Sequence, residues 1–411
     1  MRKILIVGGG QSGLQLALCL LEHGYDVTVM TVHTPEELYD GRAVSIQILY
    51  DAARKAEREY KLNFWEDEAP RINEFRLSQF VADSQSSFGW TGRLGAPAQS
   101  VDERVKMSAW LDLFESRGGK VVIHGATASD LDYLAGMYDL TVVAAGQSGL
   151  ADMFPVDPSW ETARMPELAT AIAYIEDSAD YPDQNGVGGD TIPGVSGAFV
   201  SCPTYSVHGR CRVLFLSTLA DGPLRDWPRR CSPQDHLDRM LALLREYVPH
   251  RYETYRNARL VGNDAVAMDY TTPLVRHPVA RTPSGGLLLG MGDTVVVTSP
   301  SLQQDANNAS KAAEIYLNAI LEQGEAPFDE AFMHRAFSRF MDYAQHFAGE
   351  VTARLFSSEP YIEDLVFAAS RHQGLADRFA NGFNDPQDLA TWFTDEAATR
   401  ALIAQYESGA G

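Results

Sequence analysis

The sequence predicts an α/β fold in which a parallel sheet near the N-terminus is combined with a β-rich insertion and a helical C-terminal region. A strand, a glycine turn, a helix and a second strand follow one another within the first ~30 residues, the size of a parallel βαβ unit. The stretch 170–219 is rich in β-forming residues and in Gly, Pro and Asp turns. Helical patterns dominate residues 329–406.

The individual elements follow from the apolar pattern. Apolar runs predict the buried strands, and apolar residues at helical spacing between them predict the helices. The expected strands cover residues 3–7, 26–30, 120–124, 139–145 and 285–290, and the expected helices cover residues 12–23, 101–117 and 307–323.

A glycine-rich hexapeptide, GGGQSG, joins the first strand to the first helix. Gly8 permits the tight turn, Gly10 lets the backbone approach a pyrophosphate, and Gly13 allows close packing of helix on sheet. The N–H groups of Gln11 and Ser12 then open the helix, where its dipole favours an anion. The alternative is a structural glycine turn without a ligand. The context favours a Rossmann-type dinucleotide site, and its place at the N-terminus favours FAD.

The end of the second strand lacks the acidic residue that commonly holds the ribose. Thr31 stands at that position, and one hydroxyl replaces the bidentate contact of a carboxylate. This predicts a loosely held cofactor. Thr31 is equally well explained as an ordinary residue at a strand end.

A second motif follows the late strand. Gly292 and Asp293 precede a loop with Pro300, and a helix starts near Asn307. This order is typical of FAD-dependent hydroxylase folds, in which Asp293 would hold the ribityl hydroxyls and the helix N-terminus would face the flavin ring. We therefore expect a discontinuous FAD-binding domain over residues 1–165 and 265–325, a β-rich substrate domain over 166–264 and a helical region over 326–411.

Composition narrows the classes of function. A net charge of −21 argues against a nucleic-acid partner, whose phosphates such a field repels. The sequence contains no apolar run of about 18 residues, the length that a membrane span needs, and the start of the chain resembles no signal peptide. We therefore expect a cytoplasmic protein. The four cysteines show no C-x-x-C spacing and the histidines form no ligand pattern, which favours reduced structural thiols and no metal site.

Several longer segments carry a resemblance to a known family. They are IVGGGQSGLQL at 6–16, GR at 41–42, APAQSVDER at 96–104, YDLTVV at 138–143, the block 290–309 and residues 379–386. These segments resemble the styrene and indole monooxygenases, two-component flavoproteins that use free reduced FAD. The resemblance runs from end to end, and the sequence of residues 99–104 favours the indole branch.

The resemblance implies a set of cofactor positions and partners. Flavin-side positions would be Arg42, Ser45, Gln99 and Arg104, with Asp293, Pro300, Asp305, Ala306 and Asn307 flanking the ring. It also implies a separate NADH-dependent flavin reductase that supplies reduced FAD, a small aromatic substrate and a possible homodimer. The loosely held cofactor expected from Thr31 agrees with a flavin that must exchange.

One loop departs from the family. The usual Gly-Gln-Gly-Ala/Ser-Asn sequence is replaced by Gln303, Gln304, Asp305, Ala306 and Asn307. Glycine there permits a positive φ and close approach of the backbone to the ring. Asp305 brings a negative charge towards a flavin that is anionic when reduced, and at an effective dielectric of ~20 two charges ~6 Å apart repel by roughly 3 kcal/mol.

The leading hypothesis is a monooxygenase in which reduced FAD and O₂ form the C4a-peroxyflavin, which epoxidises or hydroxylates an apolar aromatic alkene such as indole or styrene. Candidate pocket residues are Phe88, Trp90 and Tyr205, with His208 as a possible proton donor, although ordinary packing explains each of them as well. The alternatives are a tailoring oxygenase acting on a larger natural product and a degenerate flavin-binding protein. An enzyme that oxidises NAD(P)H itself is disfavoured because no second glycine-rich dinucleotide motif is present.

Overall fold

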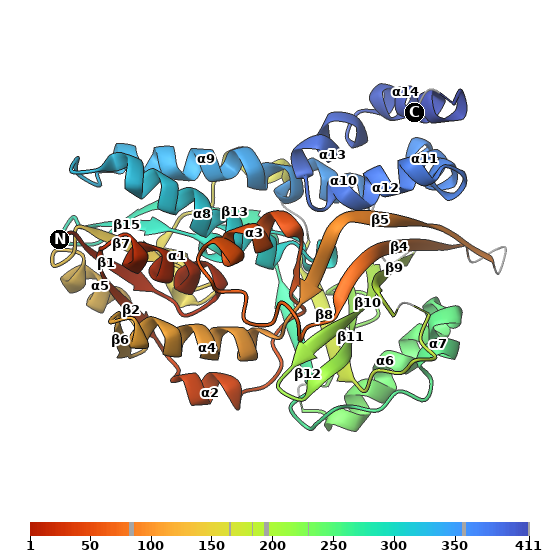
Figure 1. The fold of residues 1–411 in the computed structure, drawn as a ribbon, viewed down its shortest axis with the longest axis horizontal. Helices are drawn as coiled ribbons and strands as arrows, with labels where there is room; N and C mark the ends of the chain where they lie inside the picture. Colours follow the sequence, from red (N-terminus) through yellow and green to blue (C-terminus); the bar gives the residue numbers. More distant parts are fainter. Residues whose placement is uncertain are drawn as a thin grey trace.

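The computed structural model has two large sheets and a helical C-terminal layer (Figure 1). It describes residues 1–81, 86–163, 166–182, 184–192, 197–228, 230–355 and 359–409. No helix in these ranges is long and apolar enough to span a membrane, and within them no cluster of three potential metal ligands occurs.

The first sheet has six strands in the order β14-β15-β7-β1-β2-β6 and is parallel except for the edge strand β14. Its central strands are buried on both faces, as the apolar runs in the sequence predict. The strand bounds are β1 Lys3–Val7, β2 Asp26–Thr31, β6 Lys120–Ile123, β7 Leu140–Val143, β14 Val279–Arg281 and β15 Leu287–Gly290.

Helices cover both faces of this sheet, which is the doubly wound arrangement expected of a Rossmann-type domain (Figure 1). Among them α1 packs on both α4 and α8. The helix bounds are α1 Gln11–Glu22, α2 Pro35–Tyr39, α3 Asp51–Glu59, α4 Glu103–Ser116, α5 Ala128–Leu134 and α8 Asp305–Gln323.

The second sheet has eight strands in the order β12-β8-β11-β10-β9-β4-β5-β3 and carries α6 (Pro233–Tyr247) and α7 (Pro249–Tyr255) on one face. The predicted β-rich segment supplies β8–β11. The bounds are β3 Ile48–Leu49, β4 Arg71–Val81, β5 Ser86–Ser100, β8 Leu168–Ile175, β9 Gly186–Ile192, β10 Gly197–Ser206, β11 Gly209–Leu219 and β12 Val266–Thr271. A separate pair joins β13 (Leu274–Val275) to β16 (Val296–Val297).

The second sheet extends beyond the predicted domain boundaries. Strands β3, β4, β5 and β12 belong to it, although they lie within residues 1–165 and 265–325, the predicted FAD-binding domain. The reason is long-range pairing: β4 pairs with β9 in parallel, over 100 residues further along the chain, and β12 pairs with β8. Local patterns do not reveal such partners.

The C-terminal region is helical, as predicted. Helices α9 (Glu330–Ala348), α10 (Glu350–Leu355), α11 (Pro360–Arg371), α12 (Gln373–Gly382), α13 (Pro386–Phe393) and α14 (Glu396–Glu407) follow one another. Helix α9 packs on α8, whereas α11 and α12 pack on β5 of the second sheet (Figure 1). The helical layer therefore bridges the two sheets.

Candidate functional site

A cavity of about 870 Å³ lies at the carboxyl ends of β1 and β2; we call it the glycine-turn cavity. A ligand site at the carboxyl ends of parallel strands is the usual position in doubly wound folds. Among its lining residues are Gly8, Gly10, Thr31 and Arg42.

The glycine turn has the steric properties that the motif predicts. Gly8 adopts a φ of +129°, and a Cβ there would lie 1.9 Å from the carbonyl oxygen of Ala144. A Cβ on Gly13 would lie 2.3 Å from the carbonyl oxygen of Gly8. At Gly10 the nearest atom to such a Cβ is a Glu103 oxygen at 3.8 Å, so this glycine leaves open space. Gly8 and Gly13 are needed for the fold, and Gly10 keeps room for a ligand.

Helix α1 leaves its N-terminal donors available. Its N-cap is Gly10, no side chain caps it, and its first turn contains no acidic residue. The first main-chain bond of the helix runs from the Leu14 N–H to the Gly10 carbonyl, so the preceding N–H groups have no helical partner. This end of the helix is suited to an anion.

A second cavity of about 330 Å³ shares Gly10, Val44, Glu103, Ala144 and Gly146 with the first. Four acidic residues of the lining, of which Asp269 is the exposed one, concentrate charge here, and we call it the carboxyl cavity. Its other lining residues include Gln11, Ser12, Ser45, Asp293, Pro300, Gln303, Asp305 and Ala306.

Burial raises the pKa of three of these carboxyl groups, those of Glu103, Asp293 and Asp305, and repulsion by neighbouring carboxylates adds to the rise at Glu103 and Asp293. Burial raises the pKa of Asp305 to about 6, against a hydrogen bond donated by Thr298 Oγ1 at 2.8 Å. The pKa of Asp293 is raised well above its ordinary value by burial and then by Asp305 and Glu103. Burial, followed by the neighbouring Asp102, also raises the pKa of Glu103. The cavity therefore becomes more negative as pH rises.

The loop that departs from the family closes one side of this cavity. It follows a short 3-10 turn, η5 (Pro300–Leu302), and Gln303 adopts a left-handed conformation with φ 56° and ψ 39°. The positive φ that glycine would permit in this loop is thus adopted by a glutamine. Asp305 starts α8 and lies in its first turn, where a carboxylate interacts favourably with the helix dipole.

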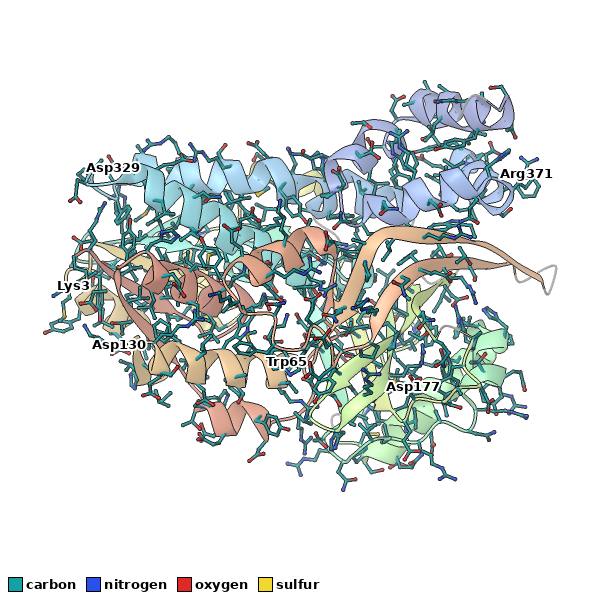
Figure 2. The ribbon with its side chains drawn as sticks, in the orientation of Figure 1. Lys3, Trp65, Asp130, Asp177, Asp329 and Arg371 are labelled. Atoms are coloured by element: carbon teal, nitrogen blue, oxygen red, sulfur yellow. The ribbon has the colours of Figure 1, made fainter. Side chains whose placement is uncertain are left out.

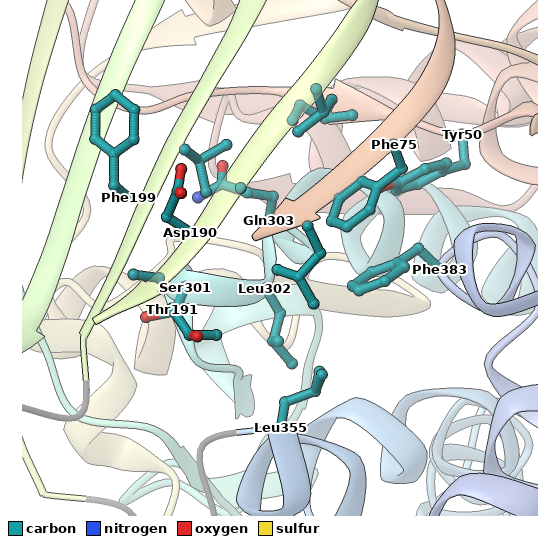
Figure 3. A pocket seen from close by; sticks show the side chains of 16 residues that line it. Tyr50, Phe75, Asp190, Thr191, Phe199, Ser301, Leu302, Gln303, Leu355 and Phe383 are labelled. Atoms are coloured by element: carbon teal, nitrogen blue, oxygen red, sulfur yellow. The ribbon is translucent and has the colours of Figure 1, made fainter. Parts of the chain in front are cut away.

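A third, smaller cavity of about 50 Å³ is mainly apolar, and we call it the apolar chamber. It lies between the second sheet, the η5 loop and the C-terminal helices (Figure 3). Figure 3 shows Tyr50, Phe75 and Phe383 grouped on one side, where the Phe75 and Phe383 rings stack at 4.6 Å. Leu302 and Leu355 also line it.

Most of the predicted site residues line the two larger cavities, and three, Gly13, Gln99 and Asn307, do not. Among the resemblance-based positions, Arg42 and Arg104 line the glycine-turn cavity, and Ser45, Asp293, Pro300, Asp305 and Ala306 line the carboxyl cavity. Gln99 and Asn307 line neither of them.

Gln99 and Asn307 instead hold main-chain groups together. The Gln99 amide donates to the carbonyls of Glu66 at 2.9 Å and Ala69 at 3.2 Å. The Asn307 side chain accepts from the Tyr50 N–H at 2.9 Å and donates to the Ile48 carbonyl at 2.8 Å, which joins α8 to β3. Both side chains therefore have a structural role in the fold, and the flavin-side roles that resemblance implies for them stay predictions.

Arg104 lies in the wall of the glycine-turn cavity with its donors engaged. It forms a bidentate pair with Asp102, at 2.7 Å for the closest contact, and also bonds to Asp264 and to the Gly41 carbonyl at 2.9 Å. Arg42 contrasts with it, since it is exposed and makes no ion pair within the described residues. Of these two arginines, Arg42 is the one available to a ligand.

The aromatic candidates named from the sequence do not form the chamber. Trp90 is buried and stacks on Phe379 at 4.8 Å. Tyr205 packs against the same small buried cluster as Trp65, which Figure 2 labels. The side chain of Phe88 lies outside the described residues. His208 binds Asp264 at 2.9 Å and lines none of the three cavities. Ordinary packing, the alternative explanation, accounts for Trp90 and Tyr205.

The residues that do form the chamber were missed. Tyr50, Phe75, Leu302 and Phe383 come from four distant segments, and no local pattern joins them. Glu103 was also missed, although a signal existed: it lies within the APAQSVDER segment and follows Asp102, the N-cap of α4.

Comparison with known proteins agrees with this architecture. A protein-family model described as "Styrene monooxygenase A putative substrate binding domain" matches residues 146–254. Styrene monooxygenases from Pseudomonas fluorescens and from another Pseudomonas species are each 28% identical over 394 residues, which cover 94% of this chain and 94% of each relative. The chain is similar to styrene monooxygenases. These matches support the styrene monooxygenase family, and the preference for the indole branch stays a prediction.

Solved structures show the same fold at low identity. A flavoprotein/dehydrogenase from Cytophaga hutchinsonii has a TM-score of 0.69 over 100% of both chains at 12% identity. A flavin-dependent brominase gives 0.64 over 99% of both chains at 13% identity. A "probable FAD-dependent monooxygenase" from Pseudomonas aeruginosa gives 0.59 over 98% of this chain and 99% of its own at 12% identity. The predicted fold class is confirmed.

Proposed function

We propose that this chain is the oxygenase component of a two-component flavin-dependent monooxygenase that oxygenates an apolar aromatic alkene such as indole or styrene. The observation that carries the proposal is the junction of two cavities at Gln303. On one side lies the carboxyl cavity, which continues into the glycine-turn cavity, and on the other lies the apolar chamber. A flavin ring and an apolar substrate would be neighbours there.

The lining residues fit FAD. Gly8, Gly10 and the free N–H groups of α1 would hold the pyrophosphate, with Arg42 as its cation. Thr31 would contact the adenosine ribose, and Asp293 the ribityl chain. Ser45, Pro300, Gln303 and Asp305 would lie around the ring.

The chain itself supplies binding, orientation and exclusion of water. When bound, reduced FAD supplies the oxygen-activating chemistry, which asks little of titratable side chains. Tyr50, Phe75 and Phe383 would hold a flat apolar substrate in the chamber and keep water out of it.

The proposed partner is an NADH-dependent flavin reductase that delivers reduced FAD. Thr31 provides one hydroxyl where a carboxylate would clamp the ribose, which suits a flavin that exchanges between two proteins. The sequence also has one GxGxxG motif in a βαβ context and no second one for NADH.

A second candidate is a flavin-binding protein that does not turn over oxygen. It is favoured by Glu103, Asp293 and Asp305, three carboxyl groups in the lining of the cavity that would receive an anionic flavin. A larger natural-product substrate, in turn, would require the apolar chamber, at about 50 Å³, to widen more than a one-ring substrate does.

The test is aerobic turnover of indole and styrene with reduced FAD from an unrelated reductase and with catalase present. Oxygenated product from the wild type, lost in Asp293→Ala but retained in Asp238→Ala on the exposed face of α6, would support the proposal. Tight binding of reduced FAD without product from either substrate, or from larger aromatic alkenes, would support the second candidate. Failure to bind reduced FAD would reject both.

A further inference from the structure

Gln303 separates the carboxyl cavity from the apolar chamber. It is the one residue in the described linings that belongs to both. Only 7% of its surface is exposed, so a polar side chain is buried at the point where the proposed cofactor and substrate would meet.

The position of this side chain is fixed by its own loop. The Gln303 N–H and the side-chain amide Nε2 both donate to the Pro300 carbonyl, at 3.2 Å and 2.7 Å. Asn307 Nδ2 donates to the Gln303 carbonyl at 3.4 Å. A left-handed backbone at a residue other than glycine persists where the surroundings hold it in this way.

One acceptor atom of the Gln303 side chain, Oε1, takes no part in these hydrogen bonds. A carbonyl can only accept, so the bond to Pro300 assigns Nε2 to that side and turns Oε1 away from it. Within the described residues, no donor is bonded to Oε1. Two other polar side chains of the chamber wall are engaged elsewhere: Ser301 Oγ donates to Ser217 Oγ at 3.0 Å, and Asp190 accepts from His250 and Arg251 at 2.8 Å and 2.6 Å.

We propose that Gln303 determines substrate specificity by offering Oε1 to a hydrogen-bond donor on a flat aromatic substrate held in the apolar chamber. The inference rests on the proposed function and deepens it, because it favours aromatics with a ring N–H over carbocycles of the same shape. A buried acceptor discriminates in this way because the analogue without the donor leaves it unpaired.

The proposal also gives Gln303 a role in substrate size. The chamber volume of about 50 Å³ is small beside the ~150 Å³ cavity that holds benzene in another protein. A one-ring ligand must therefore displace part of the chamber wall. Removal of the Gln303 side chain, which lines both cavities, would join the chamber to the carboxyl cavity. Gln303→Gly, which suits the left-handed backbone, should admit longer aromatics.

The test compares indole with indene, which has the same bicyclic shape and no N–H. In the wild type we expect kcat/KM for indole to exceed that for indene by about tenfold. In Gln303→Met, which keeps the length and removes the acceptor, the ratio should fall towards one because kcat/KM falls more for indole than for indene. Gln303→Gly should lower the ratio in the same way and provides the test if the Met variant does not fold.

A binding measurement separates this inference from the proposed function. Calorimetric titration of the protein with indole and with indene needs no turnover, so it remains informative if neither substrate is oxygenated. Preferential binding of indole by the wild type, lost in Gln303→Met, would support the role of Gln303. Equal binding of both ligands, no binding of either, or a preference that survives in both variants would overturn it.

Discussion

The two helices that begin at the carboxyl cavity, α1 and α8, offer opposite electrostatic environments to an anion. Helix α1 starts after glycines, has no acidic residue in its first turn and leaves its N–H groups to a ligand. Helix α8 carries Asp305 in its first turn, so its positive end is already partly neutralised by the chain. The phosphate end of the proposed site therefore attracts an anion, whereas the ring end opposes an anionic flavin.

The two turns also differ in what their backbone tolerates. At Gly8, a φ of +129° and a carbonyl 1.9 Å from a would-be Cβ exclude any side chain. At Gln303, a φ of 56° lies in the left-handed region, which costs an L-residue roughly 1–2 kcal/mol and remains accessible. This difference explains how the second loop can lack the glycine that the resemblance leads us to expect there while the first loop keeps its own.

The largest expected effect comes from adding one methyl group at each of two glycines. Gly10→Ala should leave the melting temperature nearly unchanged, because its Cβ meets open space, but should weaken FAD binding by about 100-fold, about 2.7 kcal/mol. Gly8→Ala should fail to fold stably. Thermal unfolding and flavin titration of both variants provide the measurement. If the Gly10→Ala protein binds FAD as tightly as the wild type does, the pyrophosphate does not bind at this turn.

The second effect concerns the ring end, through Asp305→Asn. At pH 8 the wild-type carboxyl is ionised, and the variant should bind reduced FAD about tenfold more tightly, about 1.4 kcal/mol. At pH 5, below the pKa of about 6, Asp305 is mostly protonated and the two proteins should bind alike. Anaerobic titration across this range is the measurement, with Asp269→Asn, an exposed carboxyl lining the same cavity, as the control.

The same substitution has a stability consequence with a defined sign. The folded-state pKa of Asp305 is raised above its ordinary value, so ionisation disfavours the folded state and stability is lost as pH rises from about 4 to about 6. Asp305→Asn should therefore melt at a higher temperature than the wild type at pH 8 and at the same temperature below pH 4. If the variant and the wild type melt at the same temperature at both pH values, the Asp305 carboxylate is in contact with water.

The same contrast shows what the sequence could predict. The glycine turn was predictable because its chemistry is local: strand, turn and helix adjoin in the chain, and each glycine has its own steric reason. The chamber was not, because Tyr50, Phe75 and Phe383 meet only through the long-range pairing of β4 with β9 and the docking of the C-terminal helices. Resemblance placed Gln99 near the flavin, but side-chain direction, which a motif does not record, aims its amide at main-chain carbonyls.

The smallest expected effect tests whether α1 alone attracts the pyrophosphate or Arg42 assists it. Arg42 is exposed in the wall of the glycine-turn cavity, and exposed charge pairs contribute about 0.2–1 kcal/mol, so Arg42→Ala should weaken FAD binding by roughly 2–5-fold. The loss should be largest at low ionic strength and nearly vanish at ~1 M salt, where the screening length falls to about 3 Å. Arg42→Lys keeps the charge and should retain most of the affinity. If Arg42→Ala binds FAD as the wild type does at low salt, the N–H groups of α1 alone attract the pyrophosphate. The contrast between the two helices is then between main-chain N–H groups at α1 and the Asp305 side chain at α8.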